Sequence, residues 1–336
     1  MWMLRVLLIV LLVALAACAG REPAAEAPPP APPSEYSWRQ IDQEIVGASE
    51  AAQVQAEEFA QASMDRWMDL VYQRTDSHFV PWFSGYWTQQ WLSMKVGWYR
   101  LDSDGEKEQV VQRLAQYLQE QYRKRVLDPV ARTTSPEAIM QQATRTYVQL
   151  LGQHLAEIPP RHGVPAALFD RRLQEIPAIL PAAPGSPRAS LYQITHTDPV
   201  TRLPAYAALI QGIRQAGDEN GVGNAHAGIS SVAADASARL EAELVTGGVA
   251  SVVGMAIGRV AGSLLSLGAS GFTAIARENA RPKLEAQLRQ NLNAAFDEQW
   301  LELMRNSSSG VLAGVHSLAG QIESGVAATA GRDAGF

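Results

Sequence analysis

The sequence contains a single cysteine, Cys18, and only four lysines among its 28 basic residues. One cysteine excludes an intramolecular disulfide and any zinc site built from several thiolates. Charged residues make up 18% of the chain, and its formal net charge of −6 lacks the positive surplus that attracts nucleic-acid phosphates. We therefore expect no nucleic-acid partner.

The common catalytic signatures are also missing. The sequence has no HExxH motif, no GxSxG motif and no Gly-Lys dipeptide of a phosphate-binding loop, and its six histidines are scattered. These patterns predict neither a metal site nor a bound cofactor. A glycan hydrolase needs only two carboxylates, and that alternative stays open because four carboxylates lie near predicted loops, namely Glu137, Glu157, Asp170 and Glu175.

Hydrophobic residues make up 47% of the 336 residues, enough for a sizeable core. Their spacing in steps of three and four predicts a helix in most segments of the chain. The expected helices cover residues 41–72, 106–128, 136–155 and 166–176, a stretch ending at 244, then 284–296 and 312–326. The fold class predicted from this pattern is all-α, a multi-helix bundle.

Short patterns of polar residues and proline predict where helices begin and end, and one short segment is predicted to be a strand. Ser103 and Glu106 have the spacing of a capping box, and Ser135 before Pro136 is typical of an N-cap. Pro129 should end the helix that begins after Ser103. Residues 191–195 alone have strand character.

Proline-rich stretches divide the chain. Residues 18–37 are rich in proline and alanine and predict an extended tether, and residues 177–204 form a proline-rich connector. Between and after them lie two helical regions, 38–176 and 205–336. Residues 1–17 remain as a separate leader.

That leader has one charge, Arg5, before an apolar run that is short for a membrane span. It ends in Leu15-Ala16-Ala17-Cys18, which resembles the lipobox of bacterial lipoproteins. The resemblance implies cleavage before Cys18 and a covalent lipid on its thiol, the only non-protein group expected. Ala19 follows where lipoproteins retained in the inner membrane typically carry Asp, so the implied location is the outer membrane, facing the periplasm.

An aromatic stripe lies farther along. Its members fall at steps of four, four, three and four, on one face of a helix expected to begin near Pro81: Phe83, Trp87, Trp91, Met94 and Trp98. We expect this stripe to be mainly core, because tryptophan side chains bury large apolar areas. The alternative is a groove for acyl chains, glycans or a partner helix, with Lys95 at its rim.

A second unusual stretch runs from Val245 to Ala276, where Arg259 is the only charge. Small residues recur at every fourth position: Ala250, Gly254, Gly258, Gly262, Ser266, Ser270 and Ala274. Such spacing lets helices approach closely, especially at the three glycines, and predicts a buried helical hairpin. Its expected partners are residues 281–304 and a terminal helix with Gly310, Gly314 and Gly320. The alternative is a membrane-inserting hairpin, in which Arg259 would cost about 2.5–3.5 kcal/mol near the bilayer centre.

These features favour a lipid-anchored, non-enzymatic interaction or envelope-assembly component that binds another envelope protein. Two alternatives remain: a peptidoglycan or other glycan hydrolase with a tryptophan-lined groove, and a membrane-active hairpin protein.

Replacing Cys18 with serine should abolish lipidation, because no other thiol exists in the chain. Palmitate labelling and leader cleavage should both be lost, as measured by radiolabel incorporation and gel mobility. A Cys18→Ser protein that remained in carbonate-washed membranes would show that another anchor exists.

Overall fold

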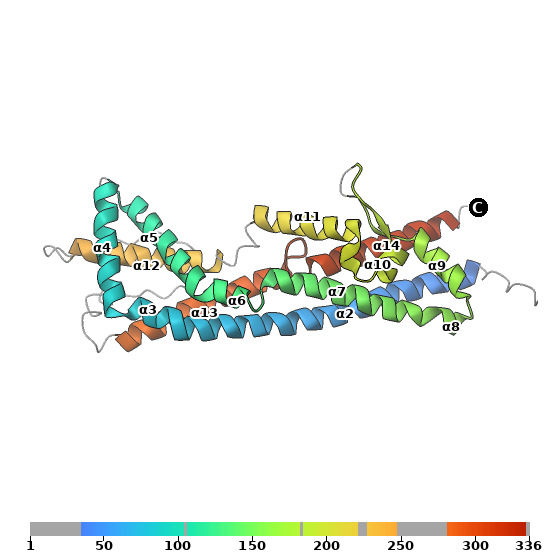
Figure 1. Ribbon diagram of the computed structural model, residues 1–336, viewed down its shortest axis with the longest axis horizontal. Coiled ribbons are helices and arrows are strands. Elements are labelled where there is room, and N and C mark those ends of the chain that lie inside the picture. Colours follow the sequence, from blue (N-terminus) through green and yellow to red (C-terminus); the bar gives the residue numbers. More distant parts are fainter. Residues whose placement is uncertain (1–34, 104–105, 182–183, 221–226, 247–280, 334–336) are drawn as a thin grey trace, which may run out of the picture.

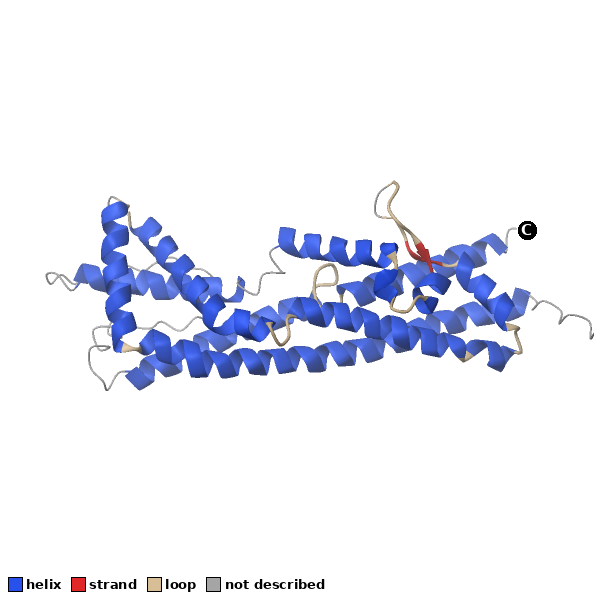
Figure 2. Ribbon diagram, in the orientation of Figure 1, coloured by secondary structure: helices blue, strands red, loops and turns tan. Residues whose placement is uncertain are grey.

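The computed structural model describes residues 35–103, 106–181, 184–220, 227–246 and 281–333. The predicted all-α bundle is confirmed: in these residues the only strands are β1 and β2, which pair antiparallel (Figure 2). Cys18, Gly254, Gly258 and Gly262 lie outside the described residues. The elements in chain order are α2 (Glu35–Arg74), π-helical η1 (Thr75–Phe79), α3 (Val80–Ser84), α4 (Tyr86–Asp102), α5 (Lys107–Tyr122), π-helical η2 (Arg123–Leu127), α6 (Asp128–Ala131), α7 (Pro136–Ala156), α8 (Ile158–His162), α9 (Ala166–Glu175), β1 (Pro177–Ile179), β2 (Ala189–Ser190), α10 (Leu191–His196), 3₁₀-helical η3 (Val200–Arg202), α11 (Pro204–Asn220), α12 (Ala227–Thr246), α13 (Arg281–Arg305) and α14 (Ala313–Asp333).

Helix α2 is the long axis of the molecule. Its 40 residues extend about 60 Å at 1.5 Å per residue. It packs against α7 and α14 along one part and against α13 and η1 along another (Figure 1). The buried side of α2 includes Ile41, Ile45, Ala48, Ala52, Ala56, Ala60, Met64, Trp67, Met68 and Val71.

The two ends of α2 carry different elements. Near its start lie α8, α9, α10 and the two short strands, whereas α3, α4, α5 and α12 are gathered at the far end (Figure 1). Helix α12 packs on both α4 and α5, and α13 packs on α3. The two helical regions predicted on either side of the connector therefore share one core rather than packing separately.

A buried ion pair fixes the start of α2. The Arg172 guanidinium on α9 donates from Nε to Asp42 Oδ1 at 3.0 Å and from Nη2 to Asp42 Oδ2 at 2.5 Å. Both side chains are buried, and the guanidinium also lies 5.7 Å from the centre of the Trp38 ring. This paired, bidentate geometry allows two charges to be buried where either one alone would be strongly destabilising.

Local capping predictions had mixed outcomes. Ser135 is the N-cap of α7, and its Oγ accepts a hydrogen bond from the backbone N–H of Ala138 at 3.2 Å. The capping box predicted at Ser103 is wrong. Ser103 instead ends α4, where its hydroxyl donates to the Tyr99 carbonyl, and Glu106 is the N-cap of α5.

Two further expectations are corrected. The helical run that begins with α5 continues through η2 into α6 and does not stop at Pro129. That proline lies in the first turn of α6, where a missing N–H costs no hydrogen bond. The strand predicted at residues 191–195 is the helix α10. A capping box formed by Ser190 and Gln193 starts this helix and outweighs the strand preference of the few residues between them.

Glycine permits one close helix crossing. A Cβ atom at Gly314 of α14 would overlap the side chain of Thr144 on α7, whereas a Cβ at Gly320 would meet no atom within 4 Å. The terminal helix therefore approaches α7 closely at Gly314. Its predicted contact with the hairpin stays a prediction, because Gly254, Gly258 and Gly262 lie outside the described residues.

These surroundings predict opposite effects for the same substitution at two glycines of α14. Gly314→Ala should lower the free energy of unfolding by about 1–3 kcal/mol through overpacking against Thr144. Gly320→Ala should raise it by about 0.5–1 kcal/mol, because alanine is the better helix former at an open position. Urea unfolding of both variants checks this, and equal gains would contradict the close crossing.

Candidate functional site

An exposed aromatic face on α4 is the most unusual surface of the described residues. Six of their nine exposed large hydrophobic side chains belong to this one helix. We call them the α4 ridge: Tyr86 (65% exposed), Trp87 (82%), Trp91 (43%), Met94 (52%), Trp98 (67%) and Leu101 (83%). Large apolar groups concentrated in this way mark an interaction surface rather than the scattered exposure found on any protein.

The opposite side of α4 explains why the ridge faces outward. Gln89, Leu92 and Val96 follow a second stripe at helical spacing, and all three are buried. Helix α4 packs against α5 and α12. Because a helix in contact with the core on one side presents its other side to solvent, the aliphatic stripe places the aromatic one outside.

The expectation that the aromatic stripe is mainly core is wrong for Trp87, Trp91, Met94 and Trp98. Only Phe83 is buried, at 2% exposure, and its ring stacks with that of Phe79 at a centroid distance of 6.1 Å. The reason is a break in the helix.

That break lies at Gly85, whose extended backbone separates α3 from α4. A Cβ on this glycine would be 3.3 Å from the carbonyl oxygens of both Pro81 and Trp82, so the turn is tight. Phe83 therefore belongs to a different helix from the four residues that follow it. The chain turns between them and the stripe is split.

Lys95 does not stand at the rim of a groove but turns between α4 and α5. Its Nζ lies 4.2 Å from the centre of the Tyr117 ring and 5.4 Å from that of Tyr99. It also lies 5.6 Å from the centre of the Trp91 ring. These cation–π contacts satisfy the ammonium group beside the ridge and help to fix α5 against α4.

A buried carboxylate joins the three helices below the ridge. Glu241 of α12 accepts a hydrogen bond from Arg100 at 2.9 Å, and its other oxygen is 3.9 Å from Lys107 Nζ at the start of α5. Arg113 of α5 pairs with Asp102 at the end of α4. The charges nearest the ridge are thus neutralised by partners, and α4 carries no carboxylate before Asp102.

A polar contact also holds α3 to α13 at this end. The Ser84 hydroxyl donates to Glu285 Oε1 at 2.6 Å, and Arg281 Nε lies 2.9 Å from the same oxygen. The hydrogen bond from Ser84, together with Arg281, lowers the pKa of the Glu285 carboxyl below its usual value. Glu285 therefore stays ionised and keeps α3 in place next to the break at Gly85.

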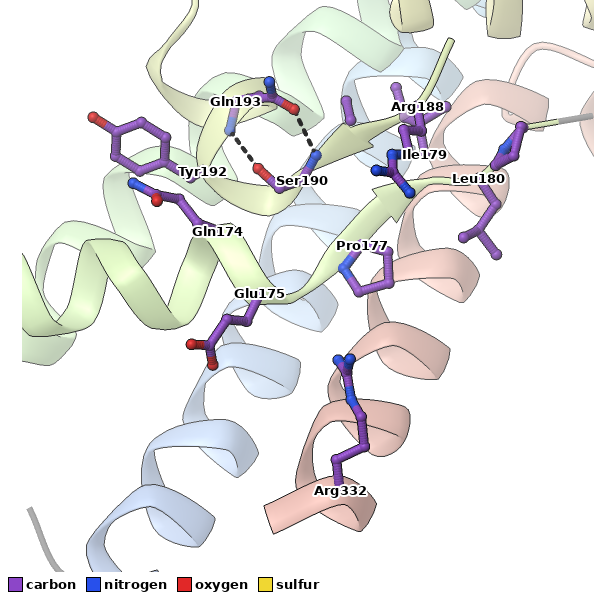
Figure 3. Close-up of a pocket in the computed structure, with 12 residues that line it drawn as sticks. Gln174, Glu175, Pro177, Ile179, Leu180, Arg188, Ser190, Tyr192, Gln193 and Arg332 are labelled. Carbon is purple, nitrogen blue, oxygen red and sulfur yellow. Dashed lines mark hydrogen bonds between the residues drawn. The ribbon is translucent and has the colours of Figure 1, made fainter. Parts of the chain in front are cut away.

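A hollow of about 850 Å³ lies at the opposite end of the molecule, between α9, the two strands, α10 and α14 (Figure 3). Two of its polar residues form the cap of α10 and bond to each other. The Ser190 backbone N–H donates to Gln193 Oε1 at 2.9 Å, and the Gln193 N–H donates to Ser190 Oγ. Because these two groups serve the helix cap, the hollow is a weaker candidate than the ridge.

The four carboxylates considered for a glycan hydrolase do not assemble with the tryptophans. Glu137 begins α7, where it pairs with Arg214, and Glu157 follows the end of α7. Asp170 and Glu175 belong to α9. None of the four lies on α3, α4, α5 or α12, so the hydrolase with a tryptophan-lined groove has no carboxylate pair from this set.

Across the described ranges, no three His, Cys, Asp or Glu side chains come together in a way that could hold a metal ion. None of the helices in those same ranges combines the length and apolar character required to span a bilayer.

The chain matches no protein-family model, no curated protein and no solved structure.

Two members of the ridge, Tyr86 and Leu101, were not among the residues predicted from the sequence. Leu101 lies three residues after Trp98, so the same helical spacing predicts that it shares the face of the stripe. The buried stripe of Leu92 and Val96 was also visible as a competing apolar face. Comparing the two faces would have indicated that α4 could bury only one of them.

Alanine substitutions on the two sides of the Gly85 break should separate core from surface. Phe83→Ala should lower the free energy of unfolding by about 3–5 kcal/mol, as expected for a buried ring. Trp87→Ala should change it by no more than about 0.5 kcal/mol, because its side chain is in solvent. Chemical denaturation measures both, and a large loss at Trp87 would contradict an exposed ridge.

Proposed function

We propose that this protein is a lipid-anchored component of the bacterial cell envelope that works by docking rather than by catalysis. The observation that carries this proposal is the α4 ridge, an uncharged aromatic strip held rigidly on a packed helix. Aromatic residues with restricted side-chain freedom are the type most enriched where proteins make high-energy contacts.

The support beneath the ridge favours a docking role. α4 is held by the buried stripe, by Lys95 against Tyr117, and by the pairing of Arg100 with Glu241. A surface already fixed in one conformation loses little entropy when it binds. The α4 ridge is accordingly preorganised for a partner.

The anchor is proposed from the lipobox resemblance at Cys18, with the outer membrane as the location and the periplasm as the compartment. The start of α2 and the ridge are at opposite ends of the molecule (Figure 1). A protein attached through its N-terminus would therefore present the ridge away from its point of attachment. This arrangement suits a component that connects the membrane to something beyond it.

Site-specific cysteine labelling tests the docking role. The only native thiol is Cys18, so a chain carrying Trp98→Cys or the control Leu301→Cys has one added thiol to follow. Both positions are exposed in the free protein. In envelope preparations, a hydrophilic maleimide should label position 301 normally and position 98 several-fold more slowly, because the partner covers the ridge.

Labelling of the purified chain supplies the reference, since both thiols should then react at similar rates. Equal rates at the two positions in the envelope as well would show that nothing docks on the ridge, and the proposed role would be wrong. Leader cleavage and palmitate labelling of the same samples report on the anchor separately.

A further inference from the structure

The chemistry and dimensions of the ridge identify what covers it. We infer that the α4 ridge docks on the interfacial region of a phospholipid bilayer, with α4 lying along the membrane surface. This inference rests on the proposed docking function and names its partner.

The residue types of the ridge suit the boundary between lipid headgroups and acyl chains. Tryptophan and tyrosine combine a large apolar ring with one hydrogen-bonding group, and they are the residues that concentrate at this boundary. The ridge contains three tryptophans and one tyrosine, joined by Met94 and Leu101. No charged side chain interrupts it, because Lys95 turns to Tyr117 and Arg100 pairs with Glu241.

The shape of the ridge suits a bilayer surface. The 17 residues of α4 extend about 25 Å, and the exposed side chains of the ridge follow one side of this helix along that length. A bilayer needs no complementary shape, because each apolar ring that enters it contributes to binding through the area it buries.

The surrounding chain points to the same partner. Residues 247–280 connect the end of α12 to the start of α13, and these two helices pack on α4 and α3 respectively. The sequence from Val245 to Ala276 has a single charge, Arg259, and is the least charged long stretch in the protein. The ridge therefore lies at the same end of the molecule as the two helix ends that this nearly uncharged sequence connects.

Vesicle flotation of residues 19–336 tests the inference without any lipid on Cys18. The probes are vesicles of phosphatidylethanolamine with phosphatidylglycerol, and neutral vesicles of phosphatidylcholine. The chain should float with both and remain bound at high salt, because the contact is apolar. Trp87→Ser combined with Trp98→Ser should lower the partition coefficient roughly tenfold or more, equivalent to the loss of about 1.4 kcal/mol of binding free energy.

A matched pair of substitutions controls for side-chain chemistry. Leu101→Ser removes an exposed leucine from the ridge, whereas Leu180→Ser removes one from the segment after β1. The first should weaken flotation several-fold and the second should leave it unchanged. Melting temperatures should be the same for both, which shows that the fold is intact.

Three results would overturn the inference. The first is that the unchanged chain stays at the bottom of the gradient with both kinds of vesicle. Flotation that survives the tryptophan changes but is abolished by Leu264→Asp with Leu265→Asp would assign binding to residues 247–280 instead. A chain that light scattering finds dimeric without vesicles, and monomeric after the tryptophan changes, would make the ridge a contact between two copies.

These outcomes are distinguishable from failure of the proposed function. Flotation does not depend on the anchor, because the tested chain begins at Ala19. If vesicles are not bound while the cysteine at position 98 is protected in the envelope, docking stands and its lipid partner is wrong. If position 98 is not protected, the docking role itself fails.

Discussion

The close approach of other helices to α2 is the constraint on which the rest of the structure depends. Ala52, Ala56 and Ala60 are fully buried on this helix, where their small side chains leave room for α7 and α14 to lie against it. A glycine on α14 meets Thr144 of α7 for the same reason. Small side chains lose little conformational entropy on burial, so a long helix can be held by many close backbone contacts rather than by a few large residues.

The far end of α2 uses larger and more specific contacts. The π-helical turns η1 and η2 pack on each other there, and Thr75 shares a 2.6 Å hydrogen bond with Tyr122 across them. Burial raises the pKa of the Tyr122 phenol, which keeps this hydroxyl protonated as a partner. Beyond these turns, Glu241 joins α12 to α4 and α5. The position of α4, and so the outward direction of its aromatic face, follows from these contacts.

Local signals in the sequence predicted the helices well and the site less well. The long helix α2 follows from the periodicity of its apolar residues. The cap at Ser135 follows from one side chain that bonds to the backbone three residues farther along. Both predictions are confirmed. The error at Trp87 and Trp98 has another cause. Periodicity shows which residues share a face, but packing by α5 and α12 decides which face is buried. One of those partners, α12, comes from a distant part of the sequence, and the short break at Gly85 had no strong periodic signal of its own.

The length of α2 has a consequence for how strongly its far end must bind. With the anchor proposed at Cys18, the length of the helix, about 60 Å, determines how far its far end extends from its start. Confined to a hemisphere of about 60 Å radius, one molecule has an effective concentration on the order of a millimolar toward any surface it can reach. A contact with only millimolar affinity in free solution would then be occupied about half of the time. Avidity from the tether allows the ridge to act as a weak and reversible contact.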